Sequence, residues 1–189
     1  LVRRANCYGT KERNMTPYGQ SVDNNQLPFL FDELYRISDY EKRSREIQAF
    51  NLEHSGKVRG ISMTATKFGI AFTARFLNQA NALVNVHVDG TVQVSTGATE
   101  MGQGVNTKLA QIAADTFGIP TTMVRVMPTS TEKNHNTSPT AASSGADLNG
   151  AAVLEAASKI KQRLQSLDKS LPWTDLIKKA YLERISLGE

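Results

Sequence analysis

The chain has 189 residues, 40% of which are hydrophobic, and its formal net charge at neutral pH is +4. This composition is ordinary for a globular chain, and the length allows one substantial domain or two small ones. The sequence contains no long apolar run and no leader-like N-terminus, so it predicts neither a membrane span nor a signal peptide. Acids and glutamines separate the basic residues of the C-terminal third, as on a solvated helix face, which argues against nucleic acid as a partner.

Cysteine and histidine residues give little sign of metal chemistry. Cys7 is the only cysteine, which excludes an internal disulfide and a cysteine-based metal site and fits a reducing compartment, so a cytoplasmic location is expected. The three histidines, His54, His87 and His135, lack the spacing of metal ligands. We therefore expect none of them to act as a ligand or a base.

The first 56 residues predict an extended or looped segment followed by a helix. Residues 1–28 are polar and contain the turn-forming sequence Thr16 to Gln20. From Phe29 to about Leu52, apolar residues recur at roughly helical spacing, and Pro28 suits the first turn of such a helix.

The next part of the chain changes to a β pattern. Strand-like sequence covers residues 60–65 and 68–76, and the clearest signal is a hairpin formed by residues 83–88 and 91–96. Valines alternate with polar residues in both arms, and Asp89-Gly90 between them can adopt the positive φ angles of a tight turn. One face of this hairpin is expected to be buried.

The remaining elements are helices with one short strand. An amphipathic helix covers residues 105–117 and ends at Gly118, a strand covers residues 123–127, a helix begins near Val153, and a last helix follows Pro172. This order predicts an α+β fold, with a mixed or antiparallel sheet and packed helices.

The pattern suggests three regions within a longer protein. We expect an N-terminal segment plus helix at 1–56, an α+β subdomain at 57–168 and a C-terminal helix at 169–189. The chain begins with Leu1 rather than Met, and Gly188-Glu189 follow the last helical pattern without a closing strand. We therefore expect an interior piece of a larger polypeptide.

A glycine-rich turn, Gly97 to Gly104, lies between the second hairpin strand and a helix start. Unpaired backbone N–H groups at such a place favour an anion. The turn is not a P-loop, because Gln103 stands where lysine is required, and it lacks the dinucleotide-binding order of glycines. The neutral Gln103 amide suits a polar ligand, whereas Glu100 is expected to accept hydrogen bonds from the turn. A simple helix-capping turn is an equally good interpretation.

A second run of small and hydroxyl residues, 136–147, leads into the helix near Val153. Thr140 and Ser143 could cap that helix or bind a phosphate, since both uses need short donor groups. Two such helix starts within one sheet-and-helix unit favour a shared anionic ligand.

These two segments resemble the molybdopterin-binding region of the xanthine dehydrogenase and aldehyde oxidase family. The resemblance rests on Thr99 to Gly104 and Thr137 to Ser143, separated by one helix and one strand. It extends to about residue 165, through four further motifs in the family's order: Thr16 to Gln20, Lys67 to Thr73, Asn78 to Ala80, and Ala146 to Gly150.

The resemblance implies a role for eight residues. Met101, Gly102 and Gln103 would border the molybdenum cofactor. Thr140, Ala142 and Ser143 would hold its pterin phosphate end and a molybdenum ligand, with the Ala142 backbone near the metal. Phe72 and Thr73 would contact a purine substrate, and an ordinary strand core residue is the less favoured alternative for Phe72. Gly145 stands where some relatives carry a further hydroxyl.

The resemblance also implies what is missing. The family's general-base glutamate, its substrate-orienting arginine and another cofactor glutamine have no counterpart, so no catalytic residue is expected in this chain. Iron–sulfur clusters and FAD would belong to other domains or another subunit. The chain would then be an incomplete, inactive part of a xanthine dehydrogenase that converts hypoxanthine and xanthine to urate.

Two alternatives remain open. One is a molybdenum hydroxylase for aldehydes or other N-heterocycles, which would share the cofactor loops. The other is a non-enzymatic anion-binding or assembly module. In either case the isolated chain should expose apolar surface and self-associate.

Overall fold

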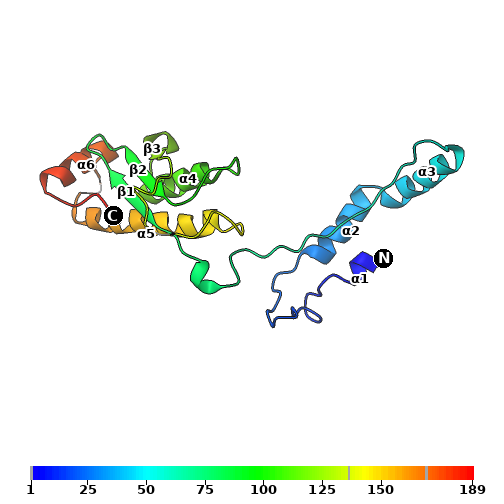
Figure 1. Cartoon of the computed structure of the whole chain (residues 1–189). Coiled ribbons are helices and arrows are strands. Elements are labelled where there is room, and N and C mark those ends of the chain that lie inside the picture. The colour runs from blue at the N-terminus through cyan, green and yellow to red at the C-terminus, as the bar shows by residue number, and fades with distance from the viewer. Residues whose placement is uncertain (1, 136, 169) are drawn as a thin grey trace. The chain divides into compact units, whose positions relative to one another are not determined.

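The computed structural model describes residues 2–135, 137–168 and 170–189, and the chain forms two compact units, Leu1–Phe68 and Gly69–Glu189 (Figure 1). Asn136, the first residue of the second candidate segment, and Lys169, the first residue of the expected C-terminal region, lie outside the described residues. The division at residues 56 and 168 stays a prediction about subdomains.

The described residues of the first unit form three helices: α1 (Val2–Ala5), α2 (Leu27–Ile37) and α3 (Tyr40–Glu53). The expected single helix from Phe29 to Leu52 is therefore wrong. Asp39 has φ of 48°, in the left-handed region, and no continuous helix can pass through that conformation. In the described part of this unit Thr16 is the only buried residue, so the helices enclose no apolar core.

The strands expected at residues 60–65 and 68–76 are also absent from the described structure. These residues are extended or irregular, and only the short 3₁₀ helix η1 (Arg75–Leu77) interrupts them. A strand needs a neighbouring backbone to pair with, whereas here the Phe72 backbone is hydrogen-bonded to the Asn78 side chain.

The sheet of the second unit consists of β1 (Ala82–Val86), β2 (Val92–Thr96) and β3 (Val124–Val126), in that order. The strands β1 and β2 form the predicted antiparallel hairpin, in which Val86 is paired with Val92, while β3 runs parallel to β2. In the turn Gly90 has φ of 85°, but Asp89 does not have a positive φ, so the expectation of positive φ angles from Asp89-Gly90 holds for the glycine alone. The loop is closed by His87 and Thr91, because His87 N–H donates to the Thr91 carbonyl at 2.8 Å.

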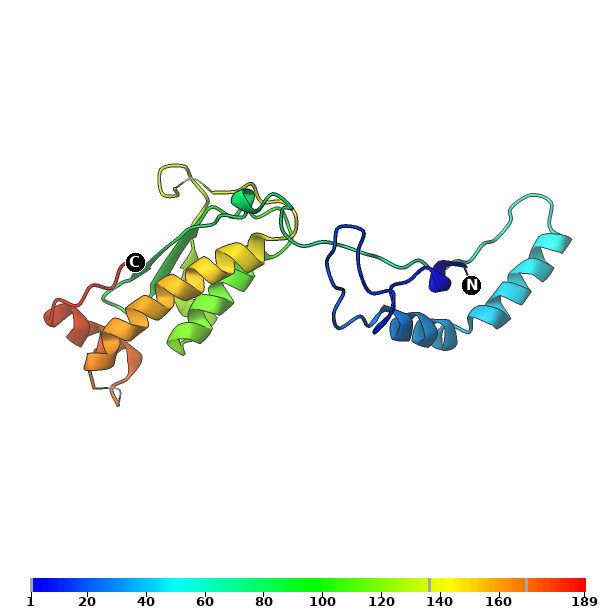
Figure 2. The same cartoon turned by 90° about the horizontal axis from the view of Figure 1, so that it is seen from below.

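Two long helices, α4 (Val105–Phe117) and α5 (Gly150–Arg163), pack side by side against one face of this sheet (Figure 2). The 3₁₀ helix η2 (Thr121–Met123) leads into β3, and η4 (Leu164–Ser166) follows α5. Helix α6 (Trp173–Leu182) contacts the hairpin at its turn, where Trp173 Nε1 donates a hydrogen bond to the Gly90 carbonyl at 2.8 Å. The predicted α+β class is confirmed.

The core of the second unit is a single apolar cluster. It contains valines of the hairpin and apolar residues of α4, α5 and α6, together with Leu187 near the C-terminus. The residues that lie fully buried in it include Val84, Val94, Leu109, Val153, Ile160 and Ile177. Residues beyond 165 thus contribute to the same core as the hairpin. Among the described residues no helix is long and apolar enough to cross a membrane.

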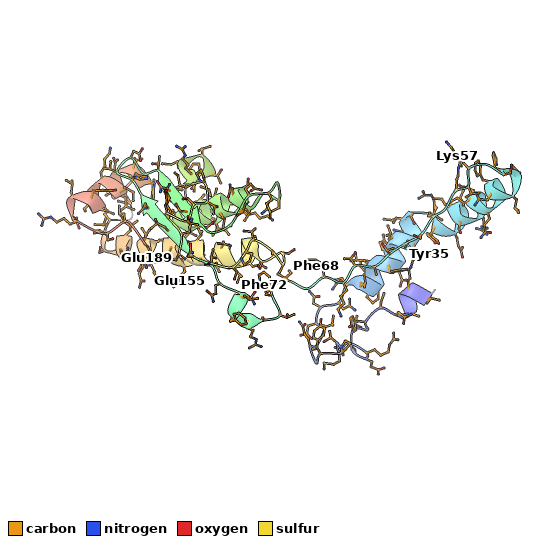
Figure 3. The ribbon with its side chains drawn as sticks, in the orientation of Figure 1. Tyr35, Lys57, Phe68, Phe72, Glu155 and Glu189 are labelled. Atoms are coloured by element: carbon orange, nitrogen blue, oxygen red, sulfur yellow. The ribbon has the colours of Figure 1, made fainter. Side chains whose placement is uncertain are left out.

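The last three residues pair with the edge of the sheet, contrary to the expectation that no closing strand follows the last helix. Val86 N–H donates to the Leu187 carbonyl at 2.9 Å, and Val84 and Glu189 exchange backbone hydrogen bonds of 2.8 and 3.0 Å. The Glu189 carboxylate also lies 3.1 Å from Lys159 Nζ, so Glu189 and Glu155 lie side by side (Figure 3). Backbone pairing at β1 therefore extends beyond the hairpin.

Candidate functional site

The glycine-rich turn folds around the carboxylate of Glu100. Its Oε1 accepts hydrogen bonds from the N–H groups of Gly102 and Gly104, both at 2.9 Å, and its Oε2 accepts one from Asn106 at 3.0 Å. Gly102 and Gly104 have φ of 95° and 76°, conformations that glycine adopts without strain. The free N–H groups at the start of α4 are thus capped by a carboxylate from the turn itself.

These contacts change the acidity of Glu100. The N–H groups of Asn106 and Gly104, followed by those of Gly102 and Met101, hold the pKa of this carboxyl below its ordinary value, and desolvation opposes them only in part. Each N–H group favours the ionised form because it donates to a negative oxygen. Glu100 is therefore a structural anion, as its place in the turn predicts.

The Gln103 side chain also bonds within the turn. Its Oε1 accepts from Met101 N–H at 2.6 Å, and its Nε2 donates to the Thr99 carbonyl at 2.8 Å. One N–H hydrogen and one lone pair of the amide remain for another partner. The side chain is held in one orientation before any ligand arrives.

The second segment lies directly against the glycine-rich turn. Thr99 N–H donates to Thr140 Oγ1 at 2.9 Å, which leaves the Thr140 hydroxyl hydrogen free to donate elsewhere. A Cβ atom added to Gly97 would lie 2.2 Å from Thr137 Cγ2. Glycine at position 97 therefore permits the close approach of the two segments.

The start of α5 has an unusual backbone. Ala142 and Ser143 both have φ of 53°, and a π-helix, η3 (Gly145–Asn149), precedes α5. Positive φ is strained for residues with a side chain, and single π turns occur often at functional sites. Buried Ser144 stabilises this bend by donating from Oγ to the Ala141 carbonyl at 3.0 Å.

A cavity of about 350 Å³ opens between the two segments and α4. Four of the six residues expected to contact a cofactor line it: Met101, Gln103, Thr140 and Ser143. The lining is completed by Val105, Lys108, Ala141, Gly145 and Ala146. Gly102 and Ala142 belong to the same two segments but do not line the cavity.

Lys108 is the residue of this cavity that the motifs did not reveal. Among the described residues of the lining it alone is charged. The signal was present in the sequence, because Lys108 follows Gly104 by four residues and so lies one turn above it on the same face of α4.

The residues expected to contact a substrate lie next to Ala142 rather than in the cavity lining. Ala71 N–H donates to the Ala142 carbonyl at 3.0 Å. Asn78 holds the next residue, because its Oδ1 accepts from Phe72 N–H at 2.9 Å and its Nδ2 donates to the Phe72 carbonyl at 2.8 Å. Phe72 is half-buried and lies near the start of α5 (Figure 3), whereas Thr73 is exposed.

Comparison of the sequence with known proteins identifies relatives along almost the whole chain. A family described as the molybdopterin cofactor-binding domain matches residues 33–189. The xanthine dehydrogenases of Calliphora vicina and Dictyostelium discoideum are 44% and 46% identical to this chain over 190 residues, and a xanthine dehydrogenase/oxidase of Felis catus is 46% identical. Each alignment covers 99% of this chain and 14% of the relative, so the chain spans 14% of their length.

Solved structures share the fold. Quinoline 2-oxidoreductase from Pseudomonas putida 86 matches with a TM-score of 0.82 and 21% identity, over 99% of this chain and 29% of that chain. The aldehyde oxidoreductase from Desulfovibrio desulfuricans matches with a TM-score of 0.63 and 18% identity, over 99% of this chain and 20% of that one. At these identities the likeness concerns the fold alone. The family match over residues 33–189 nevertheless confirms the resemblance found in the motifs, and the chain belongs to the molybdopterin cofactor-binding domain family.

Proposed function

We propose that this chain supplies the cofactor-holding part of a molybdenum-dependent hydroxylase of the xanthine dehydrogenase kind, which oxidises purines such as hypoxanthine and xanthine. The observation that carries the proposal is the cavity in which Met101, Gln103, Thr140 and Ser143 meet. The identity of 44–46% to xanthine dehydrogenases, over 99% of the chain, supports the choice of enzyme. The proposal assigns no catalytic residue to this chain.

The cavity suits a polar, anionic cofactor. Its volume of about 350 Å³ is within the range of small-molecule sites, which is roughly 300–1,000 Å³. Hydroxyls of Thr140 and Ser143, the Gln103 amide and one lysine surround it, and this donor set fits a pterin with a phosphate end. When bound, the molybdenum cofactor supplies the metal and redox chemistry of the hydroxylation.

In the proposed arrangement the two segments hold the cofactor from opposite sides. Met101, Gly102 and Gln103 border it from the glycine-rich turn. Thr140 and Ser143 donate hydroxyl groups from the second segment, and the Ala142 backbone lies nearest the metal. Because Glu100 and Thr99 already fix both segments, binding requires little reorganisation of this backbone.

In the same proposal, Phe72 and Thr73 are the residues that contact the substrate. The hydrogen bond from Ala71 to Ala142 ties that segment to the proposed metal side. An aromatic ring held in one place can stack on a purine at a small entropic cost, and an exposed hydroxyl beside it can bond to a ring heteroatom. Asn78 fixes the Phe72 backbone beside this contact.

Partners are part of the proposal as well. Exposed apolar side chains of α2, among them Phe29 and Ile37, have no core to pack on in the described residues of the first unit. We propose that the remainder of a larger molybdenum subunit covers them in the cytoplasm, and that iron–sulfur clusters and FAD are carried by other domains or a second subunit. Isolated from such partners, the chain is expected to self-associate.

The test compares molybdenum and pterin content in the full gene product and in this chain, each purified from a molybdenum-replete host. The full product should contain both and oxidise xanthine faster than aldehydes or other N-heterocycles. A preference for an aldehyde would replace the purine assignment by the alternative hydroxylase. A folded full product without molybdenum and pterin would refute cofactor binding and leave an anion-binding or assembly module.

A pair of matched variants tests the cavity itself. Thr140→Val together with Ser143→Ala should lower the pterin content of the full product several-fold, because both changes remove cavity hydroxyls. Thr107→Val together with Ser158→Ala makes the same chemical changes at exposed positions of α4 and α5. Equal pterin content in the two double variants would contradict the proposed contacts.

A further inference from the structure

The loop that carries the proposed substrate residues is attached at both of its ends to the second segment. This loop, residues 71–79, is called the substrate loop below. At its first end Ala71 N–H donates to the Ala142 carbonyl at 3.0 Å, and at its other end Gln79 is bonded to Ser138. Ser138 and Ala142 are four residues apart in the sequence, so the loop starts and ends on one short stretch of chain.

The attachment at Gln79 depends on two side-chain hydroxyls. Gln79 N–H donates to Ser138 Oγ at 3.1 Å and also contacts the Leu77 carbonyl at 3.1 Å. The Gln79 carbonyl accepts from Thr137 Oγ1 at 3.0 Å and from Ser138 N–H at 3.2 Å. Removal of the two hydroxyls would therefore loosen this end of the loop and leave one backbone bond between the segments.

The stretch of chain between the two attachment points is itself held in place. Pro139 has a fixed φ angle, and proline restricts Ser138 before it to extended conformations. The next residue, Thr140, accepts a hydrogen bond from Thr99 N–H of the glycine-rich turn at 2.9 Å. The substrate loop is thus attached to a part of the chain that is fixed relative to the proposed cofactor side.

Hydrogen bonds, rather than apolar packing, determine where the substrate loop lies. None of residues 71–79 is buried. The Asn78 side chain bonds both backbone groups of Phe72, and Gln79 Nε2 donates to the Phe76 carbonyl at 2.6 Å, so the loop keeps its shape through its own contacts. Exposed loops with few buried contacts open at a small cost in free energy. The attachments at the two ends are therefore what fixes this shape against the second segment.

We propose that Thr137 and Ser138 are positioning residues for the substrate: their hydroxyls hold Gln79 and so place Phe72 and Thr73 relative to the bound cofactor. This inference rests on the proposed function, because it takes Phe72 and Thr73 to contact a purine. Neither hydroxyl residue is among those that line the cavity. Substrate affinity should thus depend on the two hydroxyls, whereas cofactor binding should not.

The first experiment measures backbone amide hydrogen exchange in the full-length protein. The double variant Thr137→Val with Ser138→Ala removes both hydroxyls, and valine keeps the branched shape that lies against Gly97. Peptides from residues 71–79 should exchange several-fold faster in this variant, because the loop opens more often. Peptides from β1 should exchange at the original rate.

A second double variant, Thr116→Val with Ser130→Ala, is the matched control. It also removes one hydroxyl that donates to a carbonyl, from Thr116 Oγ1 to Ile112 at 2.7 Å, and one that accepts from an N–H group, from Glu132 to Ser130 Oγ at 3.2 Å. Neither bond involves the substrate loop. The control should therefore leave the exchange of that loop unchanged.

The second experiment measures steady-state kinetics with xanthine on the same full-length proteins. The Thr137→Val, Ser138→Ala variant should show a KM raised several-fold, a smaller change of kcat and the original content of molybdenum and pterin. Ser138→Thr keeps a hydroxyl acceptor and should retain the original KM. In a background of Phe72→Ala with Thr73→Val the two hydroxyls should have no further effect on kcat/KM, because residues that act through a contact lose their effect when it is absent.

The possible failures of the inference and of the proposed function differ. Unchanged loop exchange, or an unchanged KM at full cofactor content, would overturn the inference and leave the proposed function intact. An equal loss of kcat/KM in the background without the two substrate contacts would also overturn it, since the hydroxyls would act elsewhere. Absence of molybdenum and pterin from every full-length protein, the original included, would refute the proposed function and with it the substrate role of these hydroxyls.

Discussion

Ala71 and Ala142, which are 71 residues apart in the sequence, are joined by a hydrogen bond of 3.0 Å from the N–H of the first to the carbonyl of the second. Both residues have positive φ, 78° and 53°, a conformation that alanine rarely adopts. Strained residues of this kind persist where the surrounding structure holds them in place, and they cluster at ligand sites. The proposed substrate segment and the proposed cofactor segment thus meet at two strained alanines.

Substitution of Asn78 by alanine tests this connection. The change removes both hydrogen bonds to the Phe72 backbone, which should cost about 1–3 kcal/mol of stability. In the full-length enzyme the KM for xanthine should rise several-fold more than kcat falls, because a mobile Phe72 binds substrate less well. Asn51 offers a matched control, since its side chain bonds the Arg59 backbone in the same two ways.

The Asn51→Ala control should lose similar hydrogen bonds and leave the KM for xanthine unchanged. Steady-state kinetics on both variants, with molybdenum content measured in parallel, separates substrate binding from cofactor loading. An equal change of KM in the two variants would show that Phe72 has no special part in binding.

Gly97 should not tolerate a side chain. In Gly97→Ala the new Cβ would lie 2.2 Å from Thr137 Cγ2, and the overpacking should destabilise the chain by about 1–3 kcal/mol. Thr137→Ser removes that methyl group and keeps the hydroxyl that donates to the Gln79 carbonyl at 3.0 Å. The double variant should therefore recover most of the lost stability in urea denaturation.

Gly69→Ala serves as the control for this pair, because a Cβ atom at Gly69 would meet nothing within 4 Å. Its unfolding midpoint should stay close to that of the original chain. If Gly97→Ala behaved like this control, the two segments would not be as close as the structure shows.

The pH dependence of stability should report on Glu100. Its pKa is lower in the folded chain than its ordinary value, first because Asn106 N–H and then because Gly104 N–H donate to the carboxylate. A carboxylate with a lowered pKa stabilises the fold above its unfolded pKa, about 4.3, and this contribution disappears as the pH falls through the folded value. Glu100→Gln should thus be less stable than the original chain at pH 7 and should approach it in acid.

Thermal unfolding between pH 7 and pH 3 measures this difference. Glu155→Gln removes the same charge from an exposed pair with Lys159 on α5 and should change the melting temperature little at any pH. A constant difference between Glu100→Gln and the original chain over the whole range would mean that ionisation of Glu100 does not stabilise the turn.

Local patterns in the sequence were sufficient for most elements of the second unit. The hairpin was predicted because Asp89-Gly90 separates two alternating valine arms, and α4 because its apolar face ends at Gly118. The strands expected at 60–65 and 68–76 were wrong, because strand formation depends on a partner that a local pattern does not contain. The break at Asp39 was missed for a similar reason, since nothing in the periodicity of residues 29–52 requires a left-handed residue there.

The candidate site was only partly predictable. Gly97 to Gly104 and residues 136–147 each showed the composition of a helix start, but their contact through Thr99 and Thr140 depends on the tertiary fold. The composition of the two segments gave no reason to distinguish the start of α4 from the start of α5. The difference appears only in the structure, where the Glu100 carboxylate accepts hydrogen bonds at the start of α4. Lys108 was missed although it follows Gly104 by four residues, because a lysine on a helix is normally solvated and the spacing alone does not show that a cavity lies there.

The C-terminal helix should contribute strongly to the stability of the second unit. Ile177 is fully buried against the same core as the hairpin valines, so Ile177→Ala should cost about 2–5 kcal/mol through the lost methyl groups and the cavity they leave. Leu182, at the end of the same helix, is 84% exposed, and Leu182→Ala should change stability by less than about 0.5 kcal/mol. Urea denaturation of the two variants gives both free energies of unfolding. If Ile177→Ala were as stable as Leu182→Ala, residues 173–182 would be an appendage to the sheet and not part of its core.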